Sequence, residues 1–106
     1  MATSEEYARF VCEQLSGFGA IRSRKMFGEY VVYLNDKPIL SICDNIVYVK
    51  KLPVIAALMQ NAACGVPYPS AKEHYILDID NTELLYTLIP QLEAAASVPK
   101  PRKQRT

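Results

Sequence analysis

The beginning of the chain repeats apolar residues at the spacing of one helical face. These residues are Tyr7, Phe10, Val11 and Leu15. Thr3 and Glu6 have the spacing of a capping box, in which two side chains satisfy each other's backbone N–H groups. Gly17 is a suitable residue for a helix C-terminus. The pattern therefore predicts a first helix, capped by Thr3 and ending near Gly17.

The middle of the chain has the composition and spacing of an antiparallel meander. Residues 30–34, 39–43 and 46–50 are rich in β-branched and aromatic types, and polar turn residues separate them. The second separator is Asp44-Asn45, two residue types that tolerate the positive φ of a tight hairpin. We expect three strands that bury one face of a sheet and leave the other in water.

A second helix is predicted after the meander. Pro53 can occupy its first turn, which has no use for the missing N–H group. The apolar stripe of this helix consists of Val54, Leu58 and Ala62, with Ile55 and Met59 beside it. Gly65 ends it, and the two prolines within 66–70 favour a loop or a short edge strand.

The remaining pattern predicts a strand and a last helix. Residues 73–79 form the strand, with Tyr75, Leu77 and Ile79 on one face. Asp80 and Glu83 repeat the capping-box spacing. The apolar residues that follow are Leu84, Leu85, Leu88, Ile89 and Leu92. Because Pro90 lacks a backbone donor, we expect a kink or two short helices there.

These elements predict an α+β domain in two layers. Their order is α-β-β-β-α-β(-β)-α, with an antiparallel sheet and the helices stacked on one face of it. A chain of 106 residues has the usual length of one domain and can bury a core without disulfides or metals.

Composition is that of an ordinary globular protein, with 50% hydrophobic and 22% charged residues. The first residues are polar and acidic, unlike a secretory signal. The longest apolar run, residues 54–59, is too short to span a bilayer. We therefore expect a cytoplasmic protein without a membrane partner.

Charge divides the chain into two parts. Four of its twelve Lys and Arg residues lie at the C-terminus, namely Lys100, Arg102, Lys103 and Arg105. The rest of the chain has eight basic against eleven acidic residues, a formal charge of −3. Pro99 and Pro101 favour an extended backbone. We predict a folded domain over 1–97 and a flexible basic tail over 98–106.

No group of residue types indicates catalysis, a metal or a cofactor. The cysteines, at Cys12, Cys43 and Cys64, have no close pair and lie among apolar neighbours, so we expect buried thiols. His74 is the only histidine, and a place on the sheet surface is favoured over a general base. Asp78 and Asp80 alternate onto one face, but capping by Asp80 explains one of them. We expect no enzyme activity.

The most distinctive stretch joins the first helix to the meander. It combines cations with a large apolar pair and a glycine, in Arg22, Arg24, Lys25, Met26, Phe27, Gly28 and Tyr30. In a structural interpretation, which we favour, Met26 and Phe27 fill the space between helix and sheet, and Gly28 permits a turn or bulge. In a functional interpretation, the same residues contact a partner.

These residues also carry a family resemblance. The run RKMFGEY at 24–30, with ICDN at 42–45 and YVK at 48–50, resembles the N-terminal domain of the TfoX/Sxy family. The similarity continues through GVPY at 65–68 and covers about residues 5 to 95. Glu29 stands where the family commonly has a second glycine. Full-length members carry a helical C-terminal domain, and this chain resembles a stand-alone N-terminal domain.

The resemblance implies a fold similar to secretion-chaperone-like domains, and no catalytic residue. It also implies regulation of natural competence, as a coactivator of a transcription factor of the cyclic-AMP-receptor type. We therefore expect a non-enzymatic regulatory or protein-interaction module with a protein partner, of which a transcription factor is one candidate. The alternative is a weak, non-specific nucleic-acid-binding protein that uses the basic tail and the Arg22–Lys25 segment. A small enzyme is a more distant alternative.

The basic tail offers a test that distinguishes a protein-interaction module from a nucleic-acid-binding protein. Deleting residues 99–106 should remove most affinity for duplex DNA and leave Tm nearly unchanged, because these residues include no apolar type except proline. Up to four phosphate contacts give a slope of about −3 to −4 in a plot of log K against log salt concentration. Titration of both proteins with DNA at several salt concentrations measures this slope. Sequence-selective binding by the shortened protein would contradict the prediction and implicate the Arg22–Lys25 segment.

Overall fold

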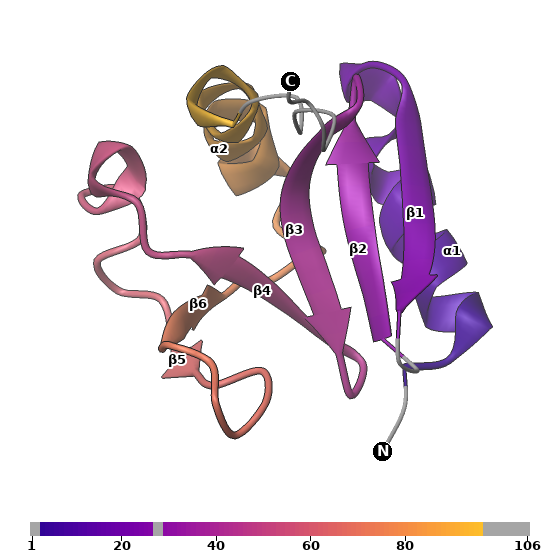
Figure 1. Ribbon diagram of the computed structural model, residues 1–106. Coiled ribbons are helices and arrows are strands. Elements are labelled where there is room, and N and C mark those ends of the chain that lie inside the picture. The colour runs from indigo at the N-terminus through magenta and orange to yellow at the C-terminus, as the bar shows by residue number, and fades with distance from the viewer. Residues whose placement is uncertain (1–2, 27–28, 97–106) are drawn as a thin grey trace, which may run out of the picture.

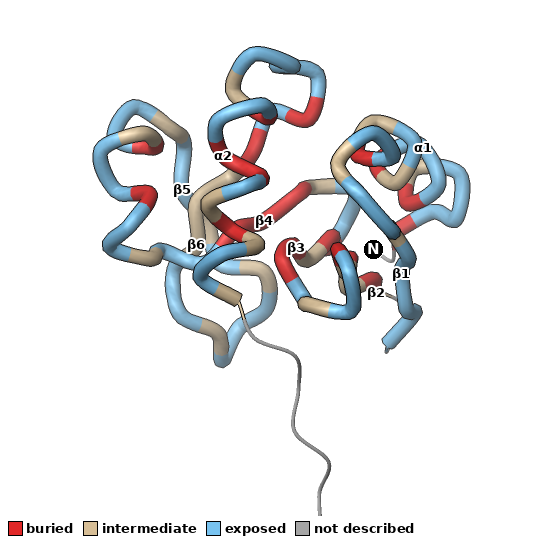
Figure 2. Tube along the Cα trace, turned by 90° about the horizontal axis from the view of Figure 1, so that it is seen from above, coloured by how far each residue is buried: buried red, intermediate tan, exposed pale blue. Residues whose placement is uncertain are grey.

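An antiparallel sheet of six strands forms the centre of the protein in a computed structural model, which describes residues 3–26 and 29–96. The strands are β1 (Ile21–Met26), β2 (Glu29–Leu34), β3 (Lys37–Cys43), β4 (Ile46–Lys50), β5 (Cys64–Gly65) and β6 (His74–Ile76). They lie in the order β1-β2-β3-β4-β6-β5. The helices α1 (Glu5–Leu15) and α2 (Thr82–Ala95) lie on the same side of the sheet (Figure 1, Figure 2). The predicted α+β class and two-layer arrangement are confirmed.

The core lies between the two helices and one face of the sheet. Along β2, every second residue is buried, whereas Val31 and Tyr33 between them are only partly covered. The buried strand residues pack with apolar residues of both helices in one cluster. Its fully buried members include Leu15 of α1, Val32 and Ile42 of the sheet, and Leu88 of α2. Each such side chain contributes about 1.5–3 kcal/mol through removal from water.

Strand β1 is the main element that the sequence pattern did not predict. We interpreted residues 22–30 as a link between helix and meander, but Ile21–Met26 pairs along its whole length with β2. Ile21 is partly buried and the next five residues are exposed. An edge strand buries little, so it lacks the alternation of apolar and polar residues by which central strands are predicted.

The predicted second helix is wrong. Its segment forms a single 3₁₀ turn, Pro53–Ile55, followed by further turns. Ile55 and Met59 are buried, but Val54 is 56% exposed, so the expected stripe does not face the core. Two buried anchors do not offset the cost of ordering a regular helix. Gly65, expected at the end of this helix, instead lies in β5.

Both α-helices begin one residue later than their capping boxes predicted. The N-cap residues are Ser4 and Asn81, and each side-chain oxygen accepts a hydrogen bond from the backbone N–H three residues on. Thr3, the predicted first cap, is buried instead. The N–H of Asp80, the predicted second cap, donates to the Asp78 carboxylate over 3.0 Å. Ser, Thr, Asn and Asp are all good caps, so spacing alone could not choose between neighbours.

In the C-terminal part of the domain, the observed elements differ in length from the predicted ones. The predicted strand 73–79 is reduced to β6, although Leu77 and Ile79 are buried as expected. Helix α2 runs as one element through Pro90, so the two short helices proposed as one possibility do not form. Buried residues on both sides of Pro90, Ile89 and Leu92, hold the helix against the core.

Asn35 connects three parts of the fold at the β2–β3 hairpin. Asn35 and Asp36 have positive φ values of 51° and 69°, as a tight turn requires. The Asn35 side-chain oxygen accepts from the N–H of Ala20 over 2.9 Å, and its amide group donates to Glu93 over 2.8 Å. The hairpin is thereby bonded to the segment before β1 and to the last turns of α2.

Two substitutions separate the contributions of Asn35. Asn35→Gly keeps the positive φ but removes both side-chain bonds, and should lower the free energy of unfolding by about 1–2 kcal/mol. Asn35→Ala removes the same bonds and places a Cβ in a left-handed conformation, at a further cost of about 1 kcal/mol. Urea unfolding measures both values. Losses below about 0.5 kcal/mol in both variants would contradict the role assigned to Asn35.

Candidate functional site

The helices leave the opposite face of the sheet open to a site (Figure 2). Strand register places Arg22 opposite Tyr33, Arg24 opposite Val31, and Met26 opposite Glu29 on this face. The row through Val31 continues across Ser41 and Tyr48. We call this surface the uncovered face.

A groove of about 540 Å³ lies on the uncovered face where β1, β2 and β3 meet the loop after β5. Its lining consists of Met26, Glu29, Tyr30, Val31, Ser41, Cys43, Pro67 and Tyr68. Met26 and Tyr68 are large side chains that remain 42% and 58% exposed. The groove therefore offers apolar surface that the folded domain does not use.

The loop after β5 starts close to the uncovered face, because Gly65 in β5 has no side chain to hold it away. A Cβ added at Gly65 would lie 3.2 Å from Ile76 Cδ1 and 3.4 Å from Tyr48 Cε1. Glycine at this position lets β5 lie against the Tyr48 ring, which is buried although it faces away from the helices. The chain beyond β5 then supplies Pro67 and Tyr68 to the groove.

A carboxylate is fixed at the edge of the groove. Glu29 Oε1 accepts hydrogen bonds from the Thr3 hydroxyl over 2.7 Å and from the Asp44 N–H over 3.0 Å. The Thr3 oxygen also accepts from the Asn45 N–H over 3.3 Å. This network ties the N-terminus to the β3–β4 hairpin and holds Glu29 in place.

The thiol of Cys43 is an apolar part of the lining. Burial raises its pKa, and the charge of Glu29 raises it further. Both effects keep the thiol protonated at neutral pH, because each disfavours the thiolate. Cys43 therefore contributes a small apolar surface and no nucleophile.

The predicted basic segment is divided by the strand. Arg22 stacks 4.2 Å from the centre of the Tyr33 ring, and its Nε lies 3.4 Å from an Asp36 carboxylate oxygen. Arg24 is exposed on the same face, whereas Lys25 falls on the opposite face because neighbouring residues in a strand alternate. The structure thus brings Arg22 and Arg24 together and separates Lys25 from them.

The structural interpretation of the motif fails for Met26. We expected Met26 to fill the space between helix and sheet, but it lines the groove on the uncovered face. Tyr30 is buried in the core cluster and also borders the groove. Phe27 and Gly28 lie outside the described residues, as do the four tail cations Lys100, Arg102, Lys103 and Arg105.

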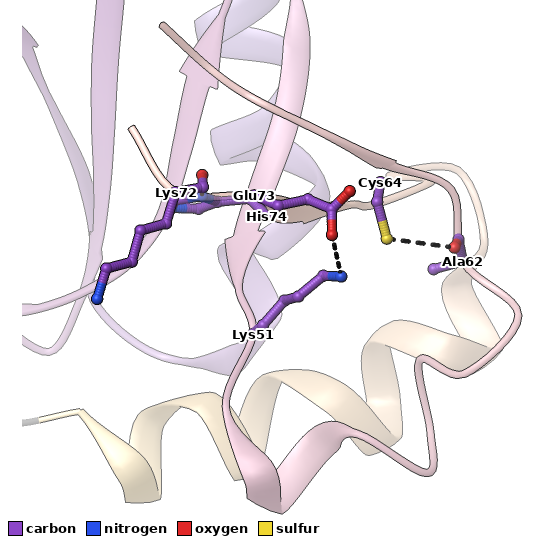
Figure 3. A network of polar contacts seen from close by, with 6 residues as sticks. All are labelled: Lys51, Ala62, Cys64, Lys72, Glu73 and His74. Carbon is purple, nitrogen blue, oxygen red and sulfur yellow. Dashed lines mark hydrogen bonds and ion pairs between the residues drawn. The ribbon is translucent and has the colours of Figure 1, made fainter. Parts of the chain in front are cut away.

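A second polar cluster lies around β5 and β6 (Figure 3). The Lys51 ammonium lies 2.6 Å from a Glu73 oxygen and 5.3 Å from the Tyr75 ring centre. Hydrogen bonds with Glu73 and then with Cys64 raise the pKa of Lys51. Cys64 is exposed and Cys12 is partly buried, so the expectation of three buried thiols is confirmed for Cys43 alone.

His74 has the surroundings of a structural residue on the sheet. Its Nδ1 lies 2.8 Å from the Lys72 carbonyl oxygen, and its ring packs edge-on against Tyr48 at 6.3 Å between centroids. Within residues 3–26 and 29–96, no group of three or more His, Cys, Asp or Glu could hold a metal ion. No helix in the same residues is long and apolar enough to cross a membrane.

Comparison with known proteins identifies the fold's family. The sequence-family model of the TfoX N-terminal domain matches residues 13–92. This range includes the strands that form the groove. The chain belongs to the TfoX N-terminal domain family. A similar protein is the "Uncharacterized 12.7 kDa protein in trpE 5'region" of Spirochaeta aurantia, 34% identical over 108 residues. That alignment covers 100% of this chain and 94% of the relative.

Sequence reasoning found one wall of the groove and missed the other. The motif around Met26 was singled out, and the TfoX-like run at 65–68 contains Pro67 and Tyr68. Nothing in the pattern indicated that these two segments meet. The contact depends on β5 folding back beside β6, and β5 is only two residues long.

Thiol reactivity tests these placements. Iodoacetamide at pH 7.5 should modify Cys64 faster than Cys12 and Cys43, because burial raises the pKa of both slower thiols and only the thiolate reacts. Mass spectrometry of the digested protein gives the three rates. In urea the rates should converge. Modification of Cys43 in the folded protein as fast as Cys64 would contradict the burial of its thiol.

Proposed function

We propose that this TfoX N-terminal domain protein is a non-enzymatic regulatory module of the cytoplasm that binds another protein through its uncovered face. The observation that carries the proposal is the groove with Met26 on one side and Tyr68 on the other. The ligand that fits it best is an apolar side chain of a partner protein, flanked by acidic residues.

The lining supports a protein as the ligand. Methionine adapts its shape to different surfaces, and tyrosine supplies large contact area at low entropic cost. Both residues are enriched where proteins meet. Arg24 lies in the next position on the same face, and a cation at the rim favours an acidic neighbour of the buried side chain.

The same lining gives little support to catalysis. Cys43 is held in its protonated form, and Glu29 already accepts two hydrogen bonds. A nucleophile needs a base within hydrogen-bonding reach. Glu29, the carboxylate of the lining, accepts its hydrogen bonds from Thr3 and from the Asp44 N–H, neither of which lines the groove.

Family membership supports a regulatory role in particular. The TfoX/Sxy resemblance implies coactivation of a transcription factor in the control of natural competence. We therefore propose a transcription factor as the partner class. The nucleic-acid alternative has less support, because Arg22 is already engaged with Asp36 and Tyr33. The described residues also carry eight cations against eleven carboxylates.

Tyr68→Ala should weaken partner binding at least tenfold, because it removes one wall of the groove. Tyr86→Ala is the matched control, since Tyr86 is 74% exposed on α2 and lies on the helix side of the sheet. Tagged proteins are incubated with nuclease-treated extract of the source cells, and bound proteins are quantified by mass spectrometry. The captured protein is then purified, and its Kd is measured by calorimetry.

We expect the same protein to bind wild type and Tyr86→Ala with equal affinity and to be lost with Tyr68→Ala. Two results would contradict the proposal. One is capture that disappears on nuclease treatment, which would favour the nucleic-acid alternative. The other is an unchanged Kd for Tyr68→Ala.

A further inference from the structure

Strand β1 presents an open edge of the sheet. It is the first strand in the sheet order and pairs only with β2 among the described strands (Figure 1). The register runs without interruption from Ile21 opposite Leu34 to Met26 opposite Glu29. The backbone groups on its other side therefore point away from the sheet, and no strand of the described part of the chain bonds them.

Folded proteins commonly protect such an edge. Usual devices are a very short strand, a proline, a bulge, a covering helix or loop, or charged side chains, and of these β1 has the charged side chains Arg22, Arg24 and Lys25. The opposite edge, β5, has only two residues. β1 has six residues and no proline, and the irregularity of this sheet lies between β2 and β3 instead. The open edge of β1 is thus regular over its whole length.

Charge indicates what such an edge would accept. Its side chains include Arg22, Arg24 and Lys25, all exposed. Arg22 is paired with Asp36, and no ion pair joins Arg24 or Lys25 to a carboxylate in the described part of the chain. The nearest carboxylate along the hairpin, Glu29, is bonded to Thr3 and to the Asp44 N–H. Two cations on the edge strand therefore have no acidic partner among residues 3–26 and 29–96.

We propose that β1 binds an extended acidic segment of a partner protein as a seventh, antiparallel strand. This inference rests on the proposed function and specifies its partner. Residues that face each other across neighbouring strands share one face. The segment then has an apolar residue facing Met26, an acidic residue two positions on facing Arg24, and another facing Arg22.

The same charges argue against other occupants. A second copy of the chain paired through β1 would bring its arginines and lysine opposite those of the first copy, and like charges placed opposite each other are destabilising. The chain's own tail is basic and would be repelled in the same way. A nucleic acid matches the charge but lacks the amide groups that bond a strand edge.

The test uses a fluorescein-labelled peptide with the core Val-Thr-Glu-Thr-Glu-Thr, and anisotropy as the measurement. Arg24→Glu should weaken its binding at least tenfold, whereas Lys72→Glu, the same charge change at an exposed loop residue, should stay within twofold. Replacing the first Glu of the peptide by Lys should restore binding to Arg24→Glu. This exchange identifies the facing pair.

Backbone bonding is tested by two N-methylated forms of the peptide. Methyl groups on alternate residues block one edge of an extended peptide, and only one of the two edges can face β1. One form should therefore bind as the unmodified peptide does, and the other at least tenfold more weakly. Equal binding of both forms would overturn the inference, as would equal competition by a single-stranded oligonucleotide of the same charge.

The inference and the proposed function can fail separately. Suppose that the captured protein binds Arg24→Glu as tightly as wild type but is lost with Tyr68→Ala. The strand-addition inference would then be wrong, and the groove would still be the binding site. Loss of the captured protein with both variants, retention with Lys72→Glu, and unequal binding of the two N-methylated peptides together support the inference.

Discussion

Burial of a single face of the sheet is the constraint on which the rest of the structure depends. Two helices cover that face, and the fully buried residues Val32, Leu34 and Ile42 lie beneath them. Because both helices are used on this side, the described residues that approach the other face are those of β5 and the loop after it. Gly65 of β5 approaches Tyr48, but Met26 and Tyr68 stay 42% and 58% exposed. The binding surface is a consequence of how the core is built.

The positions that join the elements are polar and lie at their ends. Asn35 bonds the β2–β3 hairpin to the chain before β1 and to Glu93 of α2. The Thr3 hydroxyl and the Asp44 N–H bond Glu29 at the opposite end of the sheet. These networks fix the start of β1 and both ends of β2, and Glu29 in turn is the strand partner of Met26. The groove is therefore positioned by hydrogen bonds outside it as well as by the core beneath it.

The sequence predicted the central meander well, because each strand there has a buried face and each separator favours a turn. Asp44 and Asn45 adopt the positive φ values expected of them, 53° and 58°. Elements with little burial were mispredicted. β1 has no apolar alternation, and the segment after Pro53 buries only Ile55 and Met59. The periodicity of apolar residues indicates which residues are buried. It therefore cannot predict a strand such as β1, which is held by backbone pairing, or a segment held by two buried side chains.

The candidate site was only partly predicted, for the same reason. The motif was found by its residue types and its resemblance to TfoX domains, but Met26 was assigned to the wrong face. In a strand, a shift of one residue exchanges the two faces, and without a predicted β1 no face could be assigned. The contribution of Pro67 and Tyr68 depends on tertiary contact between segments far apart in the sequence. Such contact leaves no local pattern.

The most direct test of the account is backbone amide hydrogen exchange of the protein, free and bound to its captured partner. The account predicts slower exchange in β1 and in the loop at 66–71 when the partner is bound, with α1 and α2 unchanged. Slower exchange on the helices, with β1 exchanging at its free rate, would show that the partner binds the other side of the molecule.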